Sequence, residues 1–540
     1  MKNHAMKISR RLVIVHPEKR TNSWFVLLTL FCGIGCFYFF KHCYPYHLQH
    51  REQMLLFTYS WEQLSSYWNQ PAALACLMGD FCTQFLHLKW MGPLLITLVL
   101  VNLQVISFWI LRKWTNRWVS MGFSLLIFLW EGLRFCDIRY PLSSTLSLLG
   151  GCLIFVWIRS LKNRWPFIIG SFIGLLCSYY FFGYGMFFVA GFIAIEALWR
   201  KSPSCLLISL LAIAIPGISA NYFRMLPKKA YTYPATVWMG NPNFSNERIL
   251  GLSTALYHED WIKVNELAFK GNPSNDISVC YNLANAVQGK LPERLMNFFQ
   301  PGGLALFMPI YEQSTYLSTQ LAGEVWYQLG DMTMAEHASI LSMIFSPDNK
   351  NSRMVKRLAE INLINGETEA AMKYLHILSK TLFYSDWAKE RMPGKESNSV
   401  KMWLKNKQKN VPLMDTLRLS CTDVGSSLHT LLKSNANNTM ALDYLLCFDL
   451  LMKDLDHFIA DYQQYYKGKP NRLYAEALMI QLYKKHATAK EVKATGIHPS
   501  VIKDFNLYNR VHGQSQGNPS VLRNQFGRTY WFYYQFAKFD

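Results

Sequence analysis

Hydrophobic and polar positions divide this chain of 540 residues into two unlike parts. The first 222 residues contain apolar runs long enough to cross a bilayer as helices, since roughly 20 residues span the hydrocarbon layer. These runs predict about seven membrane spans, at 23–40, 92–111, 118–136, 142–158, 166–181, 184–199 and 203–222. Residues 166–199 form one continuous apolar run, which predicts either two spans with a turn at Phe181–Gly185 or a re-entrant hairpin.

The segment between the first two predicted spans, residues 41–91, is amphipathic. Two sets of apolar residues recur there at helical spacing, separated by Pro71, which suits the first turn of a helix. The first set is Phe57, Trp61, Leu64 and Trp68, and the second is Leu74, Leu77, Met78, Phe81, Phe85 and Leu88. We expect two helices along the outer leaflet, with these faces in lipid.

Residues 223–540 have apolar positions at i, i+3 and i+4, which is typical of helices in a soluble domain. Between Tyr327 and Pro347, Gly330 is placed to end a first helix and Ala335 to let a second helix approach closely. Similar spacing recurs around Gly366, at 453–470 and, more weakly, at 258–273. These segments resemble tetratricopeptide repeats, whose stacked helical hairpins form curved binding surfaces. The alternative is a generic α-helical domain.

Two further segments of this second part have an unusual composition. Residues 391–412 are polar and basic, which predicts a long connecting loop or an insertion. Residues 526–539 are rich in Tyr, Trp and Phe, and they would either cap the helical repeats or dock onto the membrane interface.

The predicted fold is therefore all-α. Residues 1–222 form a polytopic transmembrane helix bundle of about seven spans, with the amphipathic outer loop 41–91. Residues 223–540 form an extracytoplasmic, α-helical, tetratricopeptide-like repeat domain.

Composition and charge agree with this division. Hydrophobic residues make up 51% of the chain and charged residues 17%, yet the mean hydropathy is only +0.04, too low for a chain made wholly of spans. Residues 1–222 contain 19 Lys and Arg against 7 Asp and Glu, and the rest of the chain contains 36 against 28. These values exclude both a simple cytosolic enzyme and a disordered basic protein.

The basic residues also predict an orientation. Fourteen of them precede the first predicted span or follow the second, fourth and sixth, and five lie on the opposite side. The positive-inside rule then places the N-terminus in the cytoplasm and the C-terminal domain outside it, which in the case of a bacterial inner membrane means the periplasm. Much of the net charge of +20 thus records topology. We expect the lipid bilayer as a partner and no nucleic acid.

Candidate chemistry is sparse. The sequence has no phosphate-binding loop, no nucleophile elbow, no zinc-binding H-E-x-x-H and no C-x-x-C among its 12 cysteines, so we expect no metal and no cofactor. Glu131 and Arg134, three residues apart, can simply pair on one helix face. Glu196, near a predicted cytoplasmic end, is expected to extend toward water.

The layout of about seven spans, an amphipathic first outer loop and a C-terminal extracytoplasmic domain resembles the GT-C-type glycosyltransferases, which take a sugar from a lipid-phosphate carrier. The resemblance implies an acidic residue that acts as a base or metal ligand in the first outer loop, Glu52 or Asp80, and a second acidic residue in the next outer loop, Asp137. Arg134 and Arg139 would then offset the charge of the leaving phosphate. Unlike that family, this loop has no D-x-D or adjacent acidic pair.

Two segments, Pro71–Phe85 and Phe526–Phe536, are similar to those of a domain-of-unknown-function family of multi-pass membrane proteins from Bacteroidales-type bacteria. Ala72 and Ala73 stand where that family has glycines. The resemblance spans the chain but implies no activity. The leading functional prediction is a membrane protein that holds a protein-interaction domain outside the cytoplasmic membrane and binds an envelope protein. The alternative is a GT-C-like glycosyltransferase acting at the outer leaflet.

Overall fold

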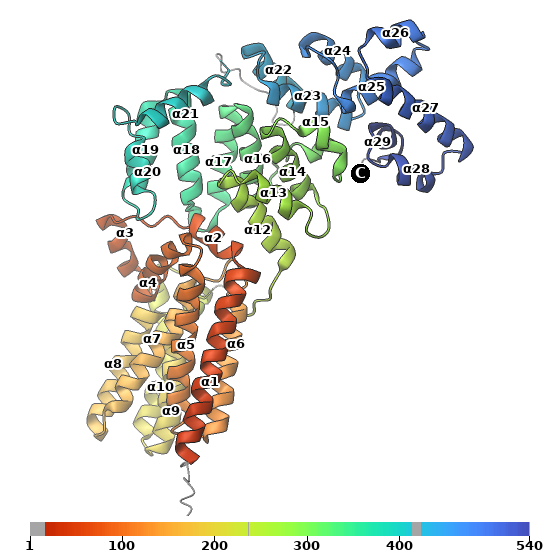
Figure 1. Ribbon diagram of the computed structural model, residues 1–540. Helices are drawn as coiled ribbons and strands as arrows, with labels where there is room; N and C mark the ends of the chain where they lie inside the picture. Colours follow the sequence, from red (N-terminus) through yellow and green to blue (C-terminus); the bar gives the residue numbers. More distant parts are fainter. Residues whose placement is uncertain (1–16, 236, 413–422, 539–540) are drawn as a thin grey trace, which may run out of the picture. The chain divides into compact units, whose positions relative to one another are not determined.

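The computed structural model describes residues 17–235, 237–412 and 423–538, and every regular element in these ranges is a helix (Figure 1). The chain forms two compact units. Unit 1 consists of two pieces of the chain, one up to Glu52 and the other Tyr59–Phe244. Unit 2 consists of Gln53–Thr58 and the chain from Ser245 onward. A short segment of the loop between the first two predicted spans therefore folds with the C-terminal half, and the chain passes between the units three times.

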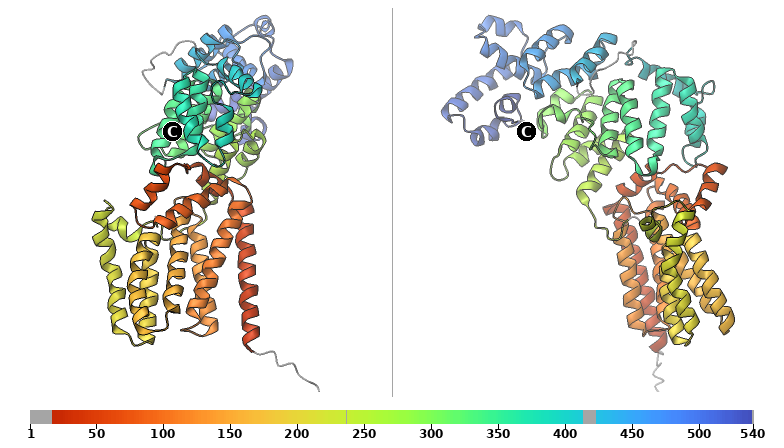
Figure 2. Two further views of the ribbon diagram at one scale, coloured as in Figure 1. Left: turned by 90° about the vertical axis from the view of Figure 1, so that its left-hand side faces the viewer. Right: turned by 180° about the vertical axis from the view of Figure 1, so that it is seen from behind.

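Unit 1 is a bundle of long helices with shorter helices at one end (Figures 1 and 2). The long helices are α1 (Pro17–Tyr38), α5 (Met91–Leu111), α6 (Arg117–Arg134), α7 (Leu142–Ser160), α8 (Arg164–Phe182), α9 (Gly185–Trp199) and α10 (Pro203–Tyr222). The shorter ones are α2 (Tyr46–Gln53), α3 (Trp61–Ser66), α4 (Ala73–Thr83) and α11 (Pro227–Thr232).

The seven predicted spans all coincide with helices, and five stretches of the described chain are long and apolar enough to cross a membrane. These are Ser23–Cys43, Met91–Leu111, Leu142–Ser160, Arg164–Phe182 and Pro203–Tyr222. Of the other two, α9 has only 15 residues, and α6 carries Arg117, Glu131 and Arg134. The continuous run 166–199 does break at the predicted place, since α8 ends at Phe182 and α9 begins at Gly185.

The first outer loop differs from the predicted pair of helices. Phe57 is not on a helix, because residues 55–60 have no regular structure, and it is buried in unit 2. Only the short α3 follows it, starting at Trp61. The second predicted helix is present as α4, and it packs against α7 and α8 through its small residues, including Ala75 and Gly79.

Unit 2 is built of shorter helices. They are α12 (Phe244–Tyr257), α13 (Trp261–Ala268), α14 (Asn275–Val287), α15 (Leu291–Arg294), α16 (Tyr316–Leu329), α17 (Met332–Phe345), α18 (Ser352–Asn365), α19 (Thr368–Ser379), α20 (Ser385–Glu390), α21 (Asn398–Gln408), α22 (Val424–Ser434), α23 (Thr439–Leu451), α24 (Leu455–Tyr465), α25 (Arg472–Lys484), α26 (Ala489–Ala494), α27 (Pro499–Gln514), α28 (Pro519–Phe526) and α29 (Tyr530–Phe536). The most extensive helix packing in unit 2 is α16 on α17, α17 on α18 and α18 on α19.

The four segments with repeat-like spacing contain helical hairpins whose turns share one geometry. Each turn has a residue of positive φ followed by an acidic residue whose N–H bonds to the carbonyl five residues back, at 2.9–3.0 Å. This is the Schellman ending of a helix. The positive-φ residues are Glu259, Gly330, Gly366 and Lys453. Lys453 thus adopts the conformation that glycine has in the two central turns.

Residues 391–412 are not simply a loop, because they contain α21. Ser397 caps this helix by accepting a hydrogen bond from the Val400 N–H, and Val400 is buried. The aromatic C-terminus is buried within unit 2, which favours capping over membrane docking. The Tyr530 hydroxyl donates to the Leu450 carbonyl at 2.9 Å, and the indole N–H of Trp531 donates to the Glu476 carbonyl at 2.8 Å.

The two glycine turns predict different responses to the same substitution. At both Gly330 (φ +102°) and Gly366 (φ +82°), alanine would be held in the left-handed region at a cost of about 1–2 kcal/mol. A Cβ at Gly330 would also lie 2.6 Å from the Asn410 carbonyl oxygen, whereas a Cβ at Gly366 would meet open space. We expect Gly330→Ala to destabilise unit 2 by roughly 1–3 kcal/mol more than Gly366→Ala. Thermal unfolding midpoints of the two full-length variants test this, and equal midpoints would contradict the packing at Asn410.

Candidate functional site

The three predicted catalytic acids, Glu52, Asp80 and Asp137, take three different partners in unit 1. Glu52, near the end of α2, is buried, and its Oε2 lies 3.4 Å from His87 Nδ1. Asp80, on α4, accepts a 2.6 Å hydrogen bond from the Tyr67 hydroxyl. Among the described residues, no three His, Cys, Asp or Glu side chains gather as a metal site would require.

Asp137, in the turn after α6, is bound by one of the two predicted phosphate-binding arginines. Its carboxylate accepts hydrogen bonds from Arg139 Nη2 at 3.0 Å and Nε at 3.2 Å, and the Arg139 side chain is 72% exposed. Burial alone would raise the pKa of Asp137, but the hydrogen bonds and charge of Arg139, together with the charge of Arg51, lower it. A carboxylate with a lowered pKa is a weak base at neutral pH, so these contacts do not favour Asp137 as a general base.

The other predicted phosphate-binding residue, Arg134, is fully buried at the end of α6. Its Nη1 donates to Glu131, and its Nε and Nη2 donate to the Val237 carbonyl at 3.0 and 2.9 Å. The guanidinium carbon lies 4.5 Å from the ring centroid of Trp130 and 4.3 Å from that of Tyr140. The guanidinium of Arg134 is thus engaged with a side chain and a carbonyl of the protein itself.

Glu131 is equally enclosed. It accepts hydrogen bonds of 2.6 Å from the hydroxyls of Tyr140 and Thr145 in addition to the bond from Arg134, and it is fully buried. The predicted pairing of Glu131 with Arg134 is thus observed, inside a larger cluster. Because Thr145 lies on α7 and Arg134 also contacts Tyr184, which caps α9, the cluster joins α6, α7 and the start of α9. Its contacts support an architectural role.

A second buried ion cluster lies at the other ends of these helices. Glu196, on α9, is not extended into water. It accepts hydrogen bonds from the indole N–H of Trp114 and from Arg200 Nε, both at 2.9 Å, and lies 3.5 Å from Arg159 Nε. Arg200 also donates to the Leu161 carbonyl at 2.8 Å. One carboxylate of α9 therefore ties together the loop after α5, the last turn of α7 and the residue that follows α9.

Unit 2 has a third such cluster, centred on Glu324 of α16. Arg353 Nη2 donates to Glu324 Oε1 at 2.9 Å, and Arg357 Nη2 donates to both carboxylate oxygens at 3.0 and 2.8 Å. Arg353 Nη1 also donates to Gln53 Oε1 at 3.2 Å, and the Ser352 hydroxyl donates to the Gln53 carbonyl at 3.0 Å. The segment 53–58 is thereby fixed to α18, 300 residues later in the chain.

The Glu196 and Glu324 clusters were missed at the sequence level, although each leaves a signal. Glu324 interrupts the apolar run of α16, and Arg353 and Arg357 are four residues apart on α18, so all three are charged residues in helices with buried faces. Glu196 and Arg200 have the same four-residue spacing. Charges in such positions indicate buried pairs, but their distant partners are not visible from spacing.

The Glu131 cluster makes a prediction for unit 1. Glu131→Gln keeps the size of the side chain but leaves the buried Arg134 charge unpaired, and we expect a loss of roughly 3–5 kcal/mol. The double variant E131Q/R134M should recover part of this loss, because it removes the orphaned charge. The exposed ion pair gives a control: Arg139→Gln should cost less than about 1 kcal/mol. Thermal unfolding in detergent measures all three, and equal losses for Glu131→Gln and Arg139→Gln would contradict the assignment.

The Glu324 cluster predicts a pH dependence for unit 2. Burial alone would raise the pKa of Glu324, but the charges of Arg357 and Arg353 lower it to about 2, against 4.5 for a free glutamate. The stabilisation is therefore fully present above pH 4.5 and is lost as the pH falls toward 2. Glu324→Gln should destabilise the protein strongly at pH 7 and progressively less below pH 4.5. Unfolding midpoints across this range test the prediction, with Glu369→Gln, at an exposed position of α19, as a control that should show no such loss at pH 7.

Comparison with known proteins identifies the family but no characterised relative. No curated protein and no solved structure matches the chain. A family model, described as a family of unknown function (DUF6057), matches residues 19–537 and so runs through both units. The chain therefore belongs to the DUF6057 family of unknown function.

Proposed function

We propose that this protein is a multi-pass protein of the bacterial inner membrane. Its seven-span bundle holds a tetratricopeptide-like domain in the periplasm, where that domain binds a protein of the cell envelope. The observation that carries the proposal is the membership of Gln53–Thr58 in unit 2, because it limits how the chain can cross the membrane.

The predicted count of seven spans is consistent with the requirement that residues 59–244 cross the membrane an even number of times. A folded unit lies on one side of a membrane, so residues 53–58 and the chain from Ser245 onward must share a side. The stretch between them, 59–244, must therefore cross an even number of times. Four of the apolar stretches that meet the length and hydropathy requirement lie within it, and α6 and α9 would make six. Consequently α6 and α9 either both cross or both do not.

Helix packing favours crossing by both. α6 packs along α5, and α9 packs against α7, α8 and α10, all of which are candidate spans (Figures 1 and 2). With 18 residues, α6 is about 27 Å long at 1.5 Å per residue, close to the roughly 30 Å of the hydrocarbon layer. The shorter α9 would be accommodated by local thinning of the bilayer.

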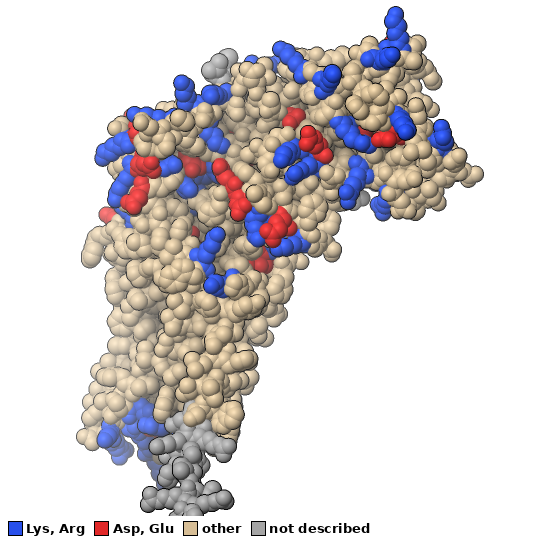
Figure 3. Space-filling view, viewed as in Figure 1, with Lys and Arg blue, Asp and Glu red and all other residues tan. Residues whose placement is uncertain are grey.

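Surface charge supports the orientation. The face of unit 1 in Figure 3 has a wide band without charged side chains, and Lys and Arg gather at one end. The basic residues at this end are Arg112 and Lys113 after α5, Arg159 in the last turn of α7, Lys162 after α7, Arg200 and Lys201 after α9, and Arg117 and Arg164 at the starts of α6 and α8. The predicted basic residues before Pro17 lie outside the described part of the chain. By the positive-inside rule, this end faces the cytoplasm.

Unit 2 offers a surface for a protein partner. Stacked helical hairpins commonly act as binding platforms rather than as enzymes. The second helices of the two central hairpins carry exposed apolar side chains, with Ile344 of α17 52% exposed and Ile340 and Ile377 each more than a third exposed. Exposed apolar side chains of this size on adjacent repeats are suited to the centre of a protein interface.

Reporter fusions after Asp540 test the topology. We expect a phosphatase that is active only outside the cytoplasm to be active on the full-length chain, and green fluorescent protein, which does not fold after ordinary export, to be dark in the same position. The opposite pattern in well-expressed fusions would contradict the proposed orientation.

Purification of the full chain from membranes tests partner binding. We expect a protein to co-purify in a fixed ratio and to be lost from the double variant I340D/I344D. The control is the double variant L507D/V521D, which adds the same two charges at exposed apolar positions of α27 and α28, outside the central hairpins. Equal loss from both variants, or no stoichiometric partner, would contradict binding at this surface.

A further inference from the structure

The positive charge of the C-terminal half is concentrated in its last helices. Residues 223–465 contain 24 Lys and Arg and 24 Asp and Glu, so they are electrically balanced. Residues 466–540, which include α25–α29, contain 12 Lys and Arg against 4 Asp and Glu. Figure 3 shows Lys and Arg over this end of unit 2, with few Asp and Glu beside them. We call residues 466–540 the basic segment.

The basic side chains of this segment are accessible, whereas its acids are engaged. All 12 Lys and Arg are exposed. Glu476 is buried and accepts a 2.9 Å hydrogen bond from Arg472, which also donates to Asp504 at 3.0 Å. Glu491 accepts a 2.6 Å hydrogen bond from a backbone N–H at the start of its own helix, and Asp540 lies outside the described residues. Arg472 is the one basic residue of the segment that forms an ion pair with a described residue.

The charges surround the helices instead of lying on a single face. Arg472 and Lys484 lie on α25, and Lys485 directly follows it. At 3.6 residues per turn, these three side chains point about 100–140° apart around the helix axis. A flat anionic surface would contact only some of these charges, whereas a flexible chain can follow them around the helices.

The basic segment has few exposed apolar side chains. Among its described residues, the large apolar side chains that are exposed are Tyr483, Leu507 and Val521, which lie singly on three helices. Protein interfaces have an apolar centre and are depleted in lysine, so this surface differs from a typical one. Binding of single-stranded nucleic acid uses several exposed aromatic rings on which bases stack, and only Tyr483 is available here.

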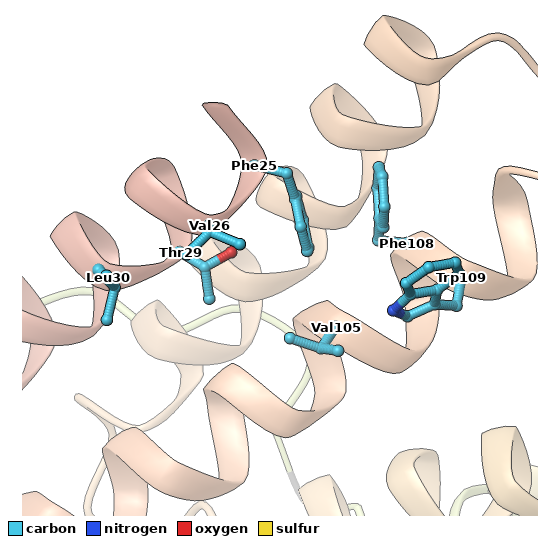
Figure 4. Close-up of a pocket in the computed structure, with 7 residues that line it drawn as sticks. All are labelled: Phe25, Val26, Thr29, Leu30, Val105, Phe108 and Trp109. Carbon is cyan, nitrogen blue, oxygen red and sulfur yellow. The ribbon is translucent and has the colours of Figure 1, made fainter. Parts of the chain in front are cut away.

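Surfaces suited to lipid look different in this protein. In unit 1, an apolar groove of about 370 Å³ lies between α1 and α5 (Figure 4). Both helices are candidate membrane spans, and Val26, Leu30 and Trp109 at the groove are each more than half exposed. A helix that binds a membrane surface needs an apolar face of this kind beside its charges. The basic segment has the charges without such a face.

We propose that the basic segment binds a flexible polyanion, a polymer that carries an anionic group on each repeating unit. Lysines and arginines on several helices contact successive anionic groups, and the released counterions supply much of the binding free energy. Charge complementarity selects this occupant, because the surface combines many exposed cations with few apolar or stacking groups. The proposal goes beyond protein binding by the central hairpins and does not rest on it.

Lysine labelling of the full-length wild-type protein in an uncharged detergent locates the binding, with long-chain inorganic polyphosphate as the probe. We expect polyphosphate to slow acylation of the test lysines severalfold and to leave the control lysines unchanged. The test lysines are Lys485, Lys490, Lys493 and Lys503, and the controls, equally exposed in the balanced part, are Lys373, Lys389, Lys401 and Lys405.

Two matched variants measure the contribution of these charges to affinity. In the full-length protein, K485Q/K490Q/K493Q/K503Q should weaken polyphosphate binding about tenfold or more at low salt, and it should reduce the slope of log affinity against log salt by roughly 3. The control K373Q/K389Q/K401Q/K405Q removes the same charge and should change neither. Polygalacturonate, a carboxylate polymer, serves as a second probe, and the tighter of the two polymers identifies the anionic group.

Four results would overturn the proposal. Equal effects on the test and control lysines would show diffuse attraction to net charge instead of binding by the basic segment. If inorganic triphosphate bound as tightly as the long chain, the site would be one for a single anion. If phosphatidylglycerol vesicles protected the test lysines as strongly as polyphosphate does, the occupant would be a membrane surface. Tighter binding of single-stranded DNA than of polyphosphate would identify a nucleic-acid site.

Discussion

The free-energy cost of taking a charge out of water governs how this chain joins its helices. Three glutamates, Glu131, Glu196 and Glu324, lie in low-exposure positions, and each is met by one or two arginines. A buried carboxylate without such partners would be strongly destabilising, so each cluster has to bring its own segments together. Two clusters lie at opposite ends of the helix bundle of unit 1, and the third fixes the segment 53–58 within unit 2. Apolar side chains pack the helices along their lengths, and these carboxylates hold particular helices and loops to one another.

The parts of the fold that could be predicted depend on local signals. Membrane helices are visible because hydropathy is averaged over a whole span, and the hairpin turns because Gly330 and Gly366 mark helix ends within a few residues. The Glu131–Arg134 pair was predictable from its spacing of three. Its remaining partners, Tyr140, Thr145 and the Val237 carbonyl, come from other segments, and no periodicity reports them. The polar α21 was missed because one cap and one buried valine leave almost no periodic pattern.

The contacts of the three candidate acids bear on whether they could act together in an enzyme active site. Glu52, Asp80 and Asp137 were grouped only by analogy with an enzyme family, and each is engaged with a different neighbour: His87, Tyr67 and Arg139. The family match, by contrast, runs from residue 19 to residue 537 and so covers both units of this chain. The buried charged residues of unit 1 join helices, and the hairpins of unit 2 carry exposed apolar side chains; both observations support the proposed binding role.

The contact between Gln53 and Arg353 has a consequence for biosynthesis. Segment 53–58 leaves the ribosome 300 residues before its main partner, a delay of roughly 15–60 seconds at synthesis rates of about 5–20 residues per second. During that interval Phe57, which is buried in the finished protein, has no folded surface to cover it. The segment therefore lacks these native contacts until α16 and α18 have been made. Unit 2 thus includes a segment that is synthesised long before the helices it contacts. Its folding cannot be completed before most of the protein has been synthesised.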